Sequence, residues 1–140
     1  MSATAAFIRD LFSDVIYGGT KELAVATLAK KVGSAFGPTL VKAIMCNWLV
    51  CMAVWLAGAA NDLAGKMVGI WFPISTFVAI GLEHSVANMF LLPLGLLGGA
   101  DMSLTDVIVK NLVPVTLGNA IAGALVVAAG YSYQFGKLGQ

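Results

Sequence analysis

The chain has 140 residues, of which 59% are hydrophobic and only 11% are charged, and its mean hydropathy is +0.91. A soluble domain usually has about a quarter of its residues charged, so this chain cannot cover itself with a polar surface. The net charge of +1 and the scattered basic residues exclude a nucleic-acid-binding surface, which needs a stripe of Lys and Arg. We therefore expect an all-α integral membrane protein. At roughly 20 residues per span, its length allows about three to four crossings.

Residues 1–35 are predicted to form an interfacial or loop-like N-terminal segment. They mix charged with apolar residues, and Gly18 and Gly19 divide them into two short pieces. Residues 1–9 lack the basic start, apolar core and small-residue cleavage site of a signal peptide. We therefore expect the N-terminus to be mature.

The first predicted span begins near Phe36. It contains residues 43–61, an uncharged run about as long as the hydrocarbon core is thick. A short connection, residues 61–66, then leads to the next apolar stretch.

The second apolar stretch, residues 67–100, is interrupted only by Glu83 and His84. A straight helix of that length would measure about 50 Å, well over the roughly 30 Å hydrocarbon core. Gly81 precedes the charged pair and Pro93 follows it, and both residue types favour a bend or break. We therefore predict that the second, middle span is discontinuous and broken at residues 81–84.

A polar loop is expected at residues 101–110, followed by a third span at residues 111–135 that carries no charge. Its small residues favour close packing between membrane helices. Residues 36–136 are thus predicted to form one transmembrane half-domain with three helices, and residues 137–140 a short tail.

His84, the only histidine, lies beside Glu83 in the middle of an apolar stretch, where an ionisable group costs several kcal/mol unless it is paired or hydrated. Adjacent helical positions diverge by about 100°, so only one of the two meets a common site unless the backbone is irregular. We favour His84 as a pore residue. The ordinary pKa of histidine, about 6.5, lets it pass a proton to an anion that a carboxylate would repel. Glu83 is then expected to accept backbone N–H groups freed at the break.

Three lysines and two amides are further candidates for an anion pathway. Lys31 and Lys42 flank the start of the first span and Lys110 that of the third, where lysines either snorkel to head groups or attract anions to a pore mouth. Asn47 and Asn119 are amides in apolar helices. Each either donates to an anion or bonds a neighbouring helix, and the sequence leaves both roles open.

Phe77 lies seven residues before His84, so it can project to the same side as a hydrophobic gate, although simple packing fits that spacing equally well. Cys46 and Cys51 are five residues apart, roughly 140° around a helix, which argues against a disulfide or a shared metal site. We expect neither a metal nor a cofactor.

Three strings of the sequence closely resemble the last three spans of the formate/nitrite transporter family. They are CNWLVCMAVWLA (residues 46–57), GLEHSVANMFLLPLG (residues 81–95) and KNLVPVTLGNAIAGAL (residues 110–125). Their order and spacing fit the family, and the resemblance covers about residues 30–133. It implies a six-span, aquaporin-like protomer made of two inverted three-helix repeats, of which this chain is the C-terminal half. It also implies a pentamer with one pore in each protomer.

The resemblance further implies roles for individual residues. By position, His84 matches the central pore histidine, Phe77 the cytoplasmic-side constriction, Asn47 and Lys31 the polar pair that supports the central site, and Asn119 the amide of the last span. We expect Lys31 near the polar end of the same cavity, which requires the helix of the first span to begin before Gly33. The residues expected to support the site are Glu83, Gly81 and Asn88.

The resulting hypothesis is a transporter, not an enzyme, that passes small monovalent anions such as formate or nitrite, either passively or with proton linkage through His84. We expect it in the plasma or inner membrane, with an organelle membrane as the other option. Its expected partners are these anions, protons, the lipid bilayer and either further copies of itself, as a pentamer, or a complementary N-terminal half. Nucleic acid is not among them.

The alternative within the family is a non-conducting truncated fragment or an assembly subunit, because the first three spans are absent from this sequence. A hydrolase using Ser85 and His84 fails, since neighbouring helical residues do not form a nucleophile and base pair. An aquaporin is disfavoured because Asn88 is not followed by the proline of that family's half-helix motif.

Overall fold

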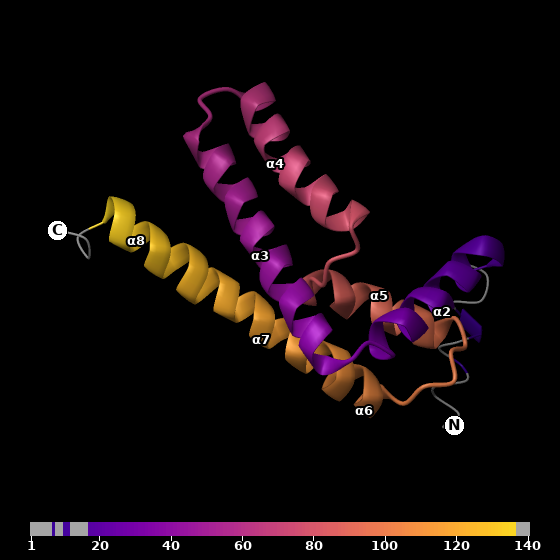
Figure 1. Cartoon of the computed structure of the whole chain (residues 1–140). Helices are drawn as coiled ribbons and strands as arrows, with labels where there is room; N and C mark the ends of the chain where they lie inside the picture. Colours follow the sequence, from indigo (N-terminus) through magenta and orange to yellow (C-terminus); the bar gives the residue numbers. More distant parts are fainter. Residues whose placement is uncertain (1–6, 8–9, 12–16, 137–140) are drawn as a thin grey trace. The chain divides into compact units, whose positions relative to one another are not determined.

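The computed structural model describes residue 7, residues 10–11 and residues 17–136, and this part of the chain is helical without any strand (Figure 1). The expected all-α class is confirmed for these residues. The chain divides into two compact units. The first unit contains Met1–Phe36 and Val86–Val113, and the second contains Gly37–Ser85 and Pro114–Gln140.

The first unit is built on helix α2 (Gly18–Val32) packed against helix α5 (Ser85–Leu97), which enters this unit at Val86. Gly95 of α5 permits the close approach, because a Cβ atom there would lie 2.6 Å from the Cβ of Leu28 and 2.8 Å from the carbonyl oxygen of Ala24. The apolar core that results consists of Leu28, Val32, Leu92 and Val107.

Helix α2 lies where the sequence predicts an interfacial or loop-like segment. The loop alternative is therefore wrong for residues 18–32. Ala24, Leu28 and Val32 recur every four residues and are all buried, which gives the helix one apolar face. An interfacial position for this helix stays a prediction.

The polar loop expected at residues 101–110 is shorter in the structure, because a helix begins at Leu104. Ser103 caps it, since its hydroxyl accepts a hydrogen bond of 3.0 Å from the backbone N–H of Asp106. One turn later Lys110 forms an ion pair of 2.7 Å with Asp106. The elements of this region are α6 (Leu104–Val107) and the π-helical turn η1 (Ile108–Leu112).

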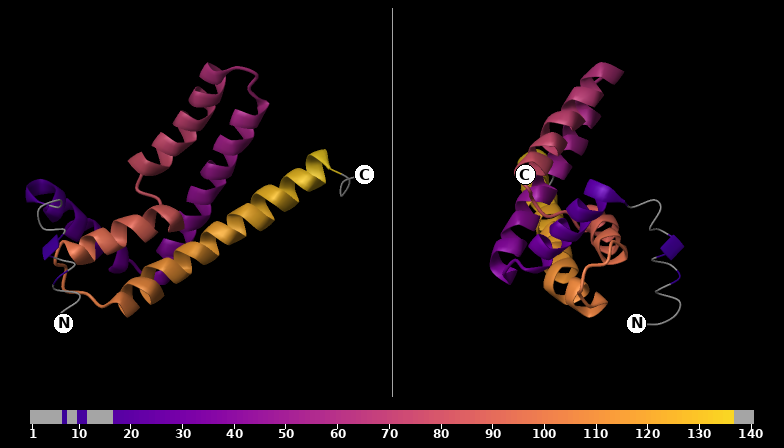
Figure 2. Two further views of the ribbon diagram at one scale, coloured as in Figure 1. Left: turned by 180° about the vertical axis from the view of Figure 1, so that it is seen from behind. Right: turned by 90° about the vertical axis from the view of Figure 1, so that its right-hand side faces the viewer.

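The second unit contains two helices that run side by side in opposite directions, α3 (Phe36–Ala59) and α4 (Leu63–Ala79), as Figures 1 and 2 show. They are in close contact at Gly69, where a Cβ atom would lie 3.1 Å from that of Leu56. The connection expected at residues 61–66 is shorter in the structure. Asp62 caps α4 by accepting a hydrogen bond of 2.8 Å from the N–H of Gly65.

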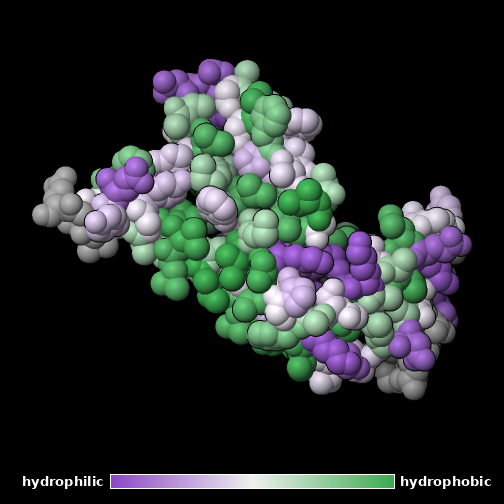
Figure 3. Space-filling model, in the orientation of Figure 1, coloured by the Kyte–Doolittle hydropathy of each residue, from purple (hydrophilic) through white to green (hydrophobic). Residues whose placement is uncertain are grey.

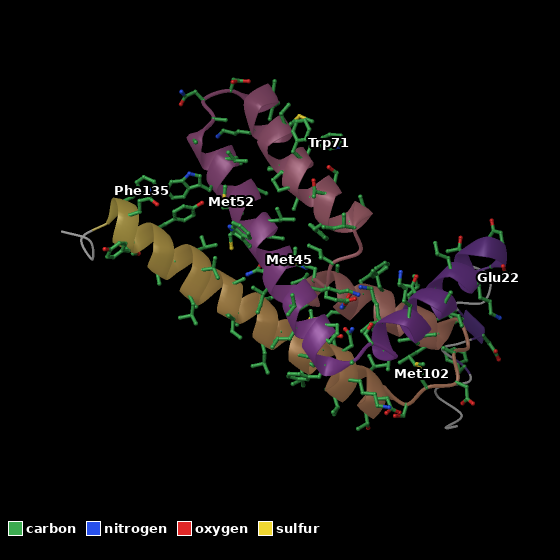
Figure 4. All side chains as sticks on the ribbon, in the orientation of Figure 1. Glu22, Met45, Met52, Trp71, Met102 and Phe135 are labelled. Atoms are coloured by element: carbon green, nitrogen blue, oxygen red, sulfur yellow. The ribbon has the colours of Figure 1, made fainter. Side chains whose placement is uncertain are left out.

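The remaining part of the second unit is a run of α7 (Val113–Ile121), η2 (Ala122–Ala129) and α8 (Gly130–Phe135) that crosses α3. A Cβ atom at Gly118 would lie 2.6 Å from that of Ala43, so glycine is needed at the crossing. Towards its C-terminal end, Tyr131 stacks on Trp55 at 4.6 Å and donates a hydrogen bond of 2.8 Å to the sulfur of Met52. Figure 4 labels Met52 of α3 and Phe135 of α8.

Within the described residues, two helices are long and apolar enough to cross a membrane. They are Phe36–Ala59, with 24 residues, and the continuous helix Leu104–Phe135, with 32 residues. The first span begins where the sequence predicts, whereas the third predicted span is part of a helix that starts before residue 111. Helices α4 and α5 are shorter, so three crossings stay a prediction. Large apolar side chains are exposed on many helices, as Figure 3 shows for one face.

Candidate functional site

The backbone is not helical between α4 and α5, and a glycine makes this possible. Gly81 has a φ of +69°, its N–H donates to the carbonyl of Val78 at 3.1 Å, and the N–H of Leu82 donates to the carbonyl of Phe77 at 3.0 Å. This pair of bonds is the Schellman motif, which ends a helix on a left-handed residue. The sequence therefore stops α4 at Ala79 and lets α5 begin at Ser85.

His84 lies at the end of this non-helical segment and contacts Phe77. The two rings stack with centroids 5.8 Å apart and an angle of 19° between their planes, and both side chains are half-buried. The sequence argument placed them on one side by a helical spacing of seven residues. In the structure the turn at Gly81 brings them together instead.

Asn119 of α7 binds the main chain on both sides of His84. Its amide nitrogen donates to the carbonyl of Glu83 at 3.1 Å, and its amide oxygen accepts from the N–H of Ser85 at 2.9 Å. The same nitrogen also donates to the carbonyl of Ala43 at 2.8 Å. Both amide hydrogens are thus used by main-chain carbonyls, which is the helix-bonding role that the sequence left open.

Asn47 of α3 completes this arrangement. Its amide nitrogen donates to the main-chain carbonyl of Asn119 at 2.6 Å, and it fits beside Gly123, where a Cβ atom would lie 3.1 Å from that nitrogen. Glu83 is buried, with 4% of its surface exposed, whereas its neighbour His84 is half-exposed. The irregular backbone thus gives the two ionisable neighbours different environments.

The candidate residues in the first unit form a second amide cluster. The amide nitrogen of Asn88 donates to the amide oxygen of Asn111 at 2.8 Å, and the nitrogen of Asn111 donates to the main-chain carbonyl of Lys31 at 3.3 Å. Asn111 is a residue that the sequence reasoning missed as a candidate. Its only signal was an amide at the start of an apolar run.

Lys31 belongs to α2, which ends at Val32, and α3 begins at Phe36. The expectation that the helix of the first span begins before Gly33 is therefore wrong. A position of Lys31 at the polar end of the His84 cavity then rests on the family resemblance alone and stays a prediction. Among the described residues, no group of three or more His, Cys, Asp or Glu residues is arranged to hold a metal ion.

The model of the formate/nitrite transporter family matches residues 2–133 of this chain. The chain belongs to the formate/nitrite transporter family. A probable formate transporter from Methanothermobacter thermautotrophicus is 49% identical over 121 residues, which cover 86% of this chain and 43% of that protein. The nitrite transporter NirC of Escherichia coli is 38% identical over 135 residues, which cover 91% of this chain and 48% of NirC.

Solved channel structures of the formate/nitrite transporter type have the same fold. A pentameric formate channel with formate bound matches with a TM-score of 0.74 and 32% identity, covering 83% of this chain and 52% of the channel. An FNT family ion channel matches with a TM-score of 0.80 and 31% identity, covering 93% of this chain and 53% of the channel. The chain thus spans about half the length of these four proteins, and it is an integral membrane protein of a transporter family.

Proposed function

We propose that this chain forms half of the wall of a pore for small monovalent anions such as formate or nitrite. In this proposal α4 and α5 are the two parts of one discontinuous span, the middle one of three. The observation that carries it is His84, which ends the break between these helices, stacks on Phe77 and has both flanking peptide groups bound by Asn119.

An anion that enters an apolar passage loses its hydration, and this costs far more than the passage of a neutral molecule. His84 supplies a ring N–H that donates a hydrogen bond or a proton at this point, so that the anion crosses as a bound ion or as the neutral acid. Because Asn119 holds the peptide groups on both sides of His84 and Phe77 stacks on its ring, the imidazole is oriented before the anion arrives. Asn119 is therefore a positioning residue in this proposal.

Phe77 is proposed as the constriction that excludes hydrated ions on one side of His84. Its main chain is held, because the carbonyl of Phe77 closes the cap of α4, and its ring stacks on His84. The start of α5 directly after His84 adds a partial positive charge that favours anions. Lys31 is proposed to attract anions towards the pore mouth.

The similarity to a pentameric formate channel supports further copies of the chain as partners, in a pentamer. Because the chain spans about half of its relatives, a complementary half that carries three further spans is a second partner. The same observation favours the alternative of a non-conducting fragment or assembly subunit. The plasma or inner membrane is the proposed location.

The test is formate uptake into liposomes that contain either this chain alone or this chain together with the first three spans of the Methanothermobacter relative. We call the second preparation the complemented chain. Formate uptake by the complemented chain above that of empty liposomes is expected. Uptake at the level of empty liposomes in both preparations would favour the non-conducting alternative.

Two substitutions then test His84 in the complemented chain. His84→Phe keeps an aromatic ring but removes the N–H donor, and should abolish formate uptake. His84→Asn keeps a donor that does not titrate near neutral pH, and should retain uptake with a changed pH response. Normal uptake and pH dependence in His84→Phe would contradict the proposed mechanism.

A further inference from the structure

The last carbonyl groups of an α-helix have no partner within the helix and must find one elsewhere. At the end of α2 three of them are satisfied. The carbonyl of Ala29 accepts from the N–H of Gly33 at 2.9 Å, and that of Lys30 from the hydroxyl of Ser34 at 3.3 Å. The carbonyl of Lys31 accepts instead from Asn111, which lies 80 residues further along the chain.

This bond fixes the orientation of two amide groups. A carbonyl only accepts hydrogen bonds, so Asn111 presents its NH2 group to Lys31 and its oxygen to Asn88. Asn88 in turn presents its own NH2 group to Asn111. Turning either amide over would set two donors or two acceptors against each other.

The environment makes these bonds hard to replace. Asn88 and Asn111 are 1% and 0% exposed, so water does not substitute for a lost partner. Asn111 lies in the π-helical turn η1, where the N–H of Val113 donates to the carbonyl of Ile108, five residues earlier. Such turns widen a helix by one residue and change the direction of its side chains.

We infer that Asn111 is a positioning residue for anion attraction. It fixes the last turn of α2, which carries Lys31, and it also fixes the amide of Asn88. The inference rests on the proposed function, in which Lys31 attracts the anion. Asn111 itself is not proposed to touch the anion, because its oxygen and its nitrogen both have protein partners.

The experiment compares two variants of similar shape in the complemented chain. Asn111→Val removes both bonds, whereas the hydroxyl of Asn111→Thr can donate to the Lys31 carbonyl and accept from Asn88. We expect the KM for formate to rise about tenfold in the Val variant and to stay within about threefold of wild type in the Thr variant. Asn111→Leu, which fills more of the amide's volume, replaces the Val variant if that does not assemble.

A double-mutant cycle with Lys31→Met separates positioning from simple stability. If Asn111 acts through Lys31, Asn111→Val should cause no further rise in KM when Lys31 is already Met. A purely structural role would reduce the amount of assembled channel by the same factor in both backgrounds and leave KM unchanged. That pattern, or an equal rise in KM in both backgrounds, would overturn the inference.

The control is Asn61→Val, at an exposed amide in the connection between α3 and α4, which should keep the wild-type KM. If wild type and this control both fail to take up formate, the proposed function fails and the inference fails with it. If both take up formate and Asn111→Val keeps the wild-type KM, only the inference fails.

Discussion

Removal of the Asn119 side chain is the most direct test of the clamp around His84, by which we mean the two hydrogen bonds of Asn119 to the carbonyl of Glu83 and the N–H of Ser85. Asn119→Leu keeps a similar volume but leaves three main-chain groups without their side-chain partner: the carbonyls of Ala43 and Glu83 and the N–H of Ser85. Ala43 lies inside α3, where a helical N–H also serves its carbonyl, so its loss is small. The other two groups flank His84 directly.

A buried group left without a hydrogen bond costs about 1–3 kcal/mol, so the two flanking groups together cost about 2 kcal/mol or more. If this cost falls on the orientation of His84, formate uptake by the complemented chain decreases about 30-fold, since about 1.4 kcal/mol corresponds to a factor of ten. Asn119→Asp should lose at least as much. Its carboxylate still accepts from Ser85, but it sets a second oxygen against the two carbonyls.

The assay is the initial rate of formate uptake per assembled channel, with the thermal unfolding midpoint measured on the same samples. Asn61→Leu, the same substitution at an exposed amide, is the matched control and should stay within twofold of wild type. Asn119→Leu with uptake within threefold of wild type would refute the clamp. A decrease in uptake with wild-type orientation of His84, as monitored by its imidazole NMR signals, would refute the positioning role.

Two further substitutions test the constriction and the helix break. Phe77→Ala should raise the leak of larger anions at every pH, because it opens the passage without changing a titrating group. Phe72→Ala, at an exposed ring of the same helix, is the control and should not raise this leak. Anion selectivity in liposomes measures both variants. Gly81→Ala forces an L-residue to a φ of +69°, which costs about 1–2 kcal/mol, and should lower the thermal unfolding midpoint. Gly58→Ala, in α3 with open space around it, is the control and should leave the midpoint unchanged or slightly higher.

The family and the helical class were predictable from the sequence because both depend on local patterns. The three quoted strings carried the family assignment, which the match over residues 2–133 confirms. The glycine at position 81 predicted an interrupted backbone, because only glycine adopts its φ without strain. Helix α3 begins at Phe36, as the apolar run predicted.

Other features escaped because they depend on partners far apart in the sequence. The charges of residues 18–32 suggested an interfacial or loop-like segment. One face of α2 is nevertheless buried, because Gly95 lets α5 approach it closely, and the sequence of α2 alone does not show this contact. Ser103 starts a helix inside a segment that composition marked as a loop. The roles of Asn119 and Asn111 required knowledge of which carbonyls they meet, at separations of 36 to 80 residues.

These two amides share a physical reason to be where they are. Inside a bilayer no water is available to form a hydrogen bond with an unpaired backbone carbonyl or N–H. Helix ends and breaks are therefore tolerated only where side chains supply these hydrogen bonds. The helix Leu104–Phe135 provides both side chains: Asn111 for the end of α2 and Asn119 for the break after α4. The two asparagines of this helix are therefore explained by a helix end and a helix break elsewhere in the chain. Asn119 is not proposed to bind the anion, because both hydrogens of its amide already have main-chain partners.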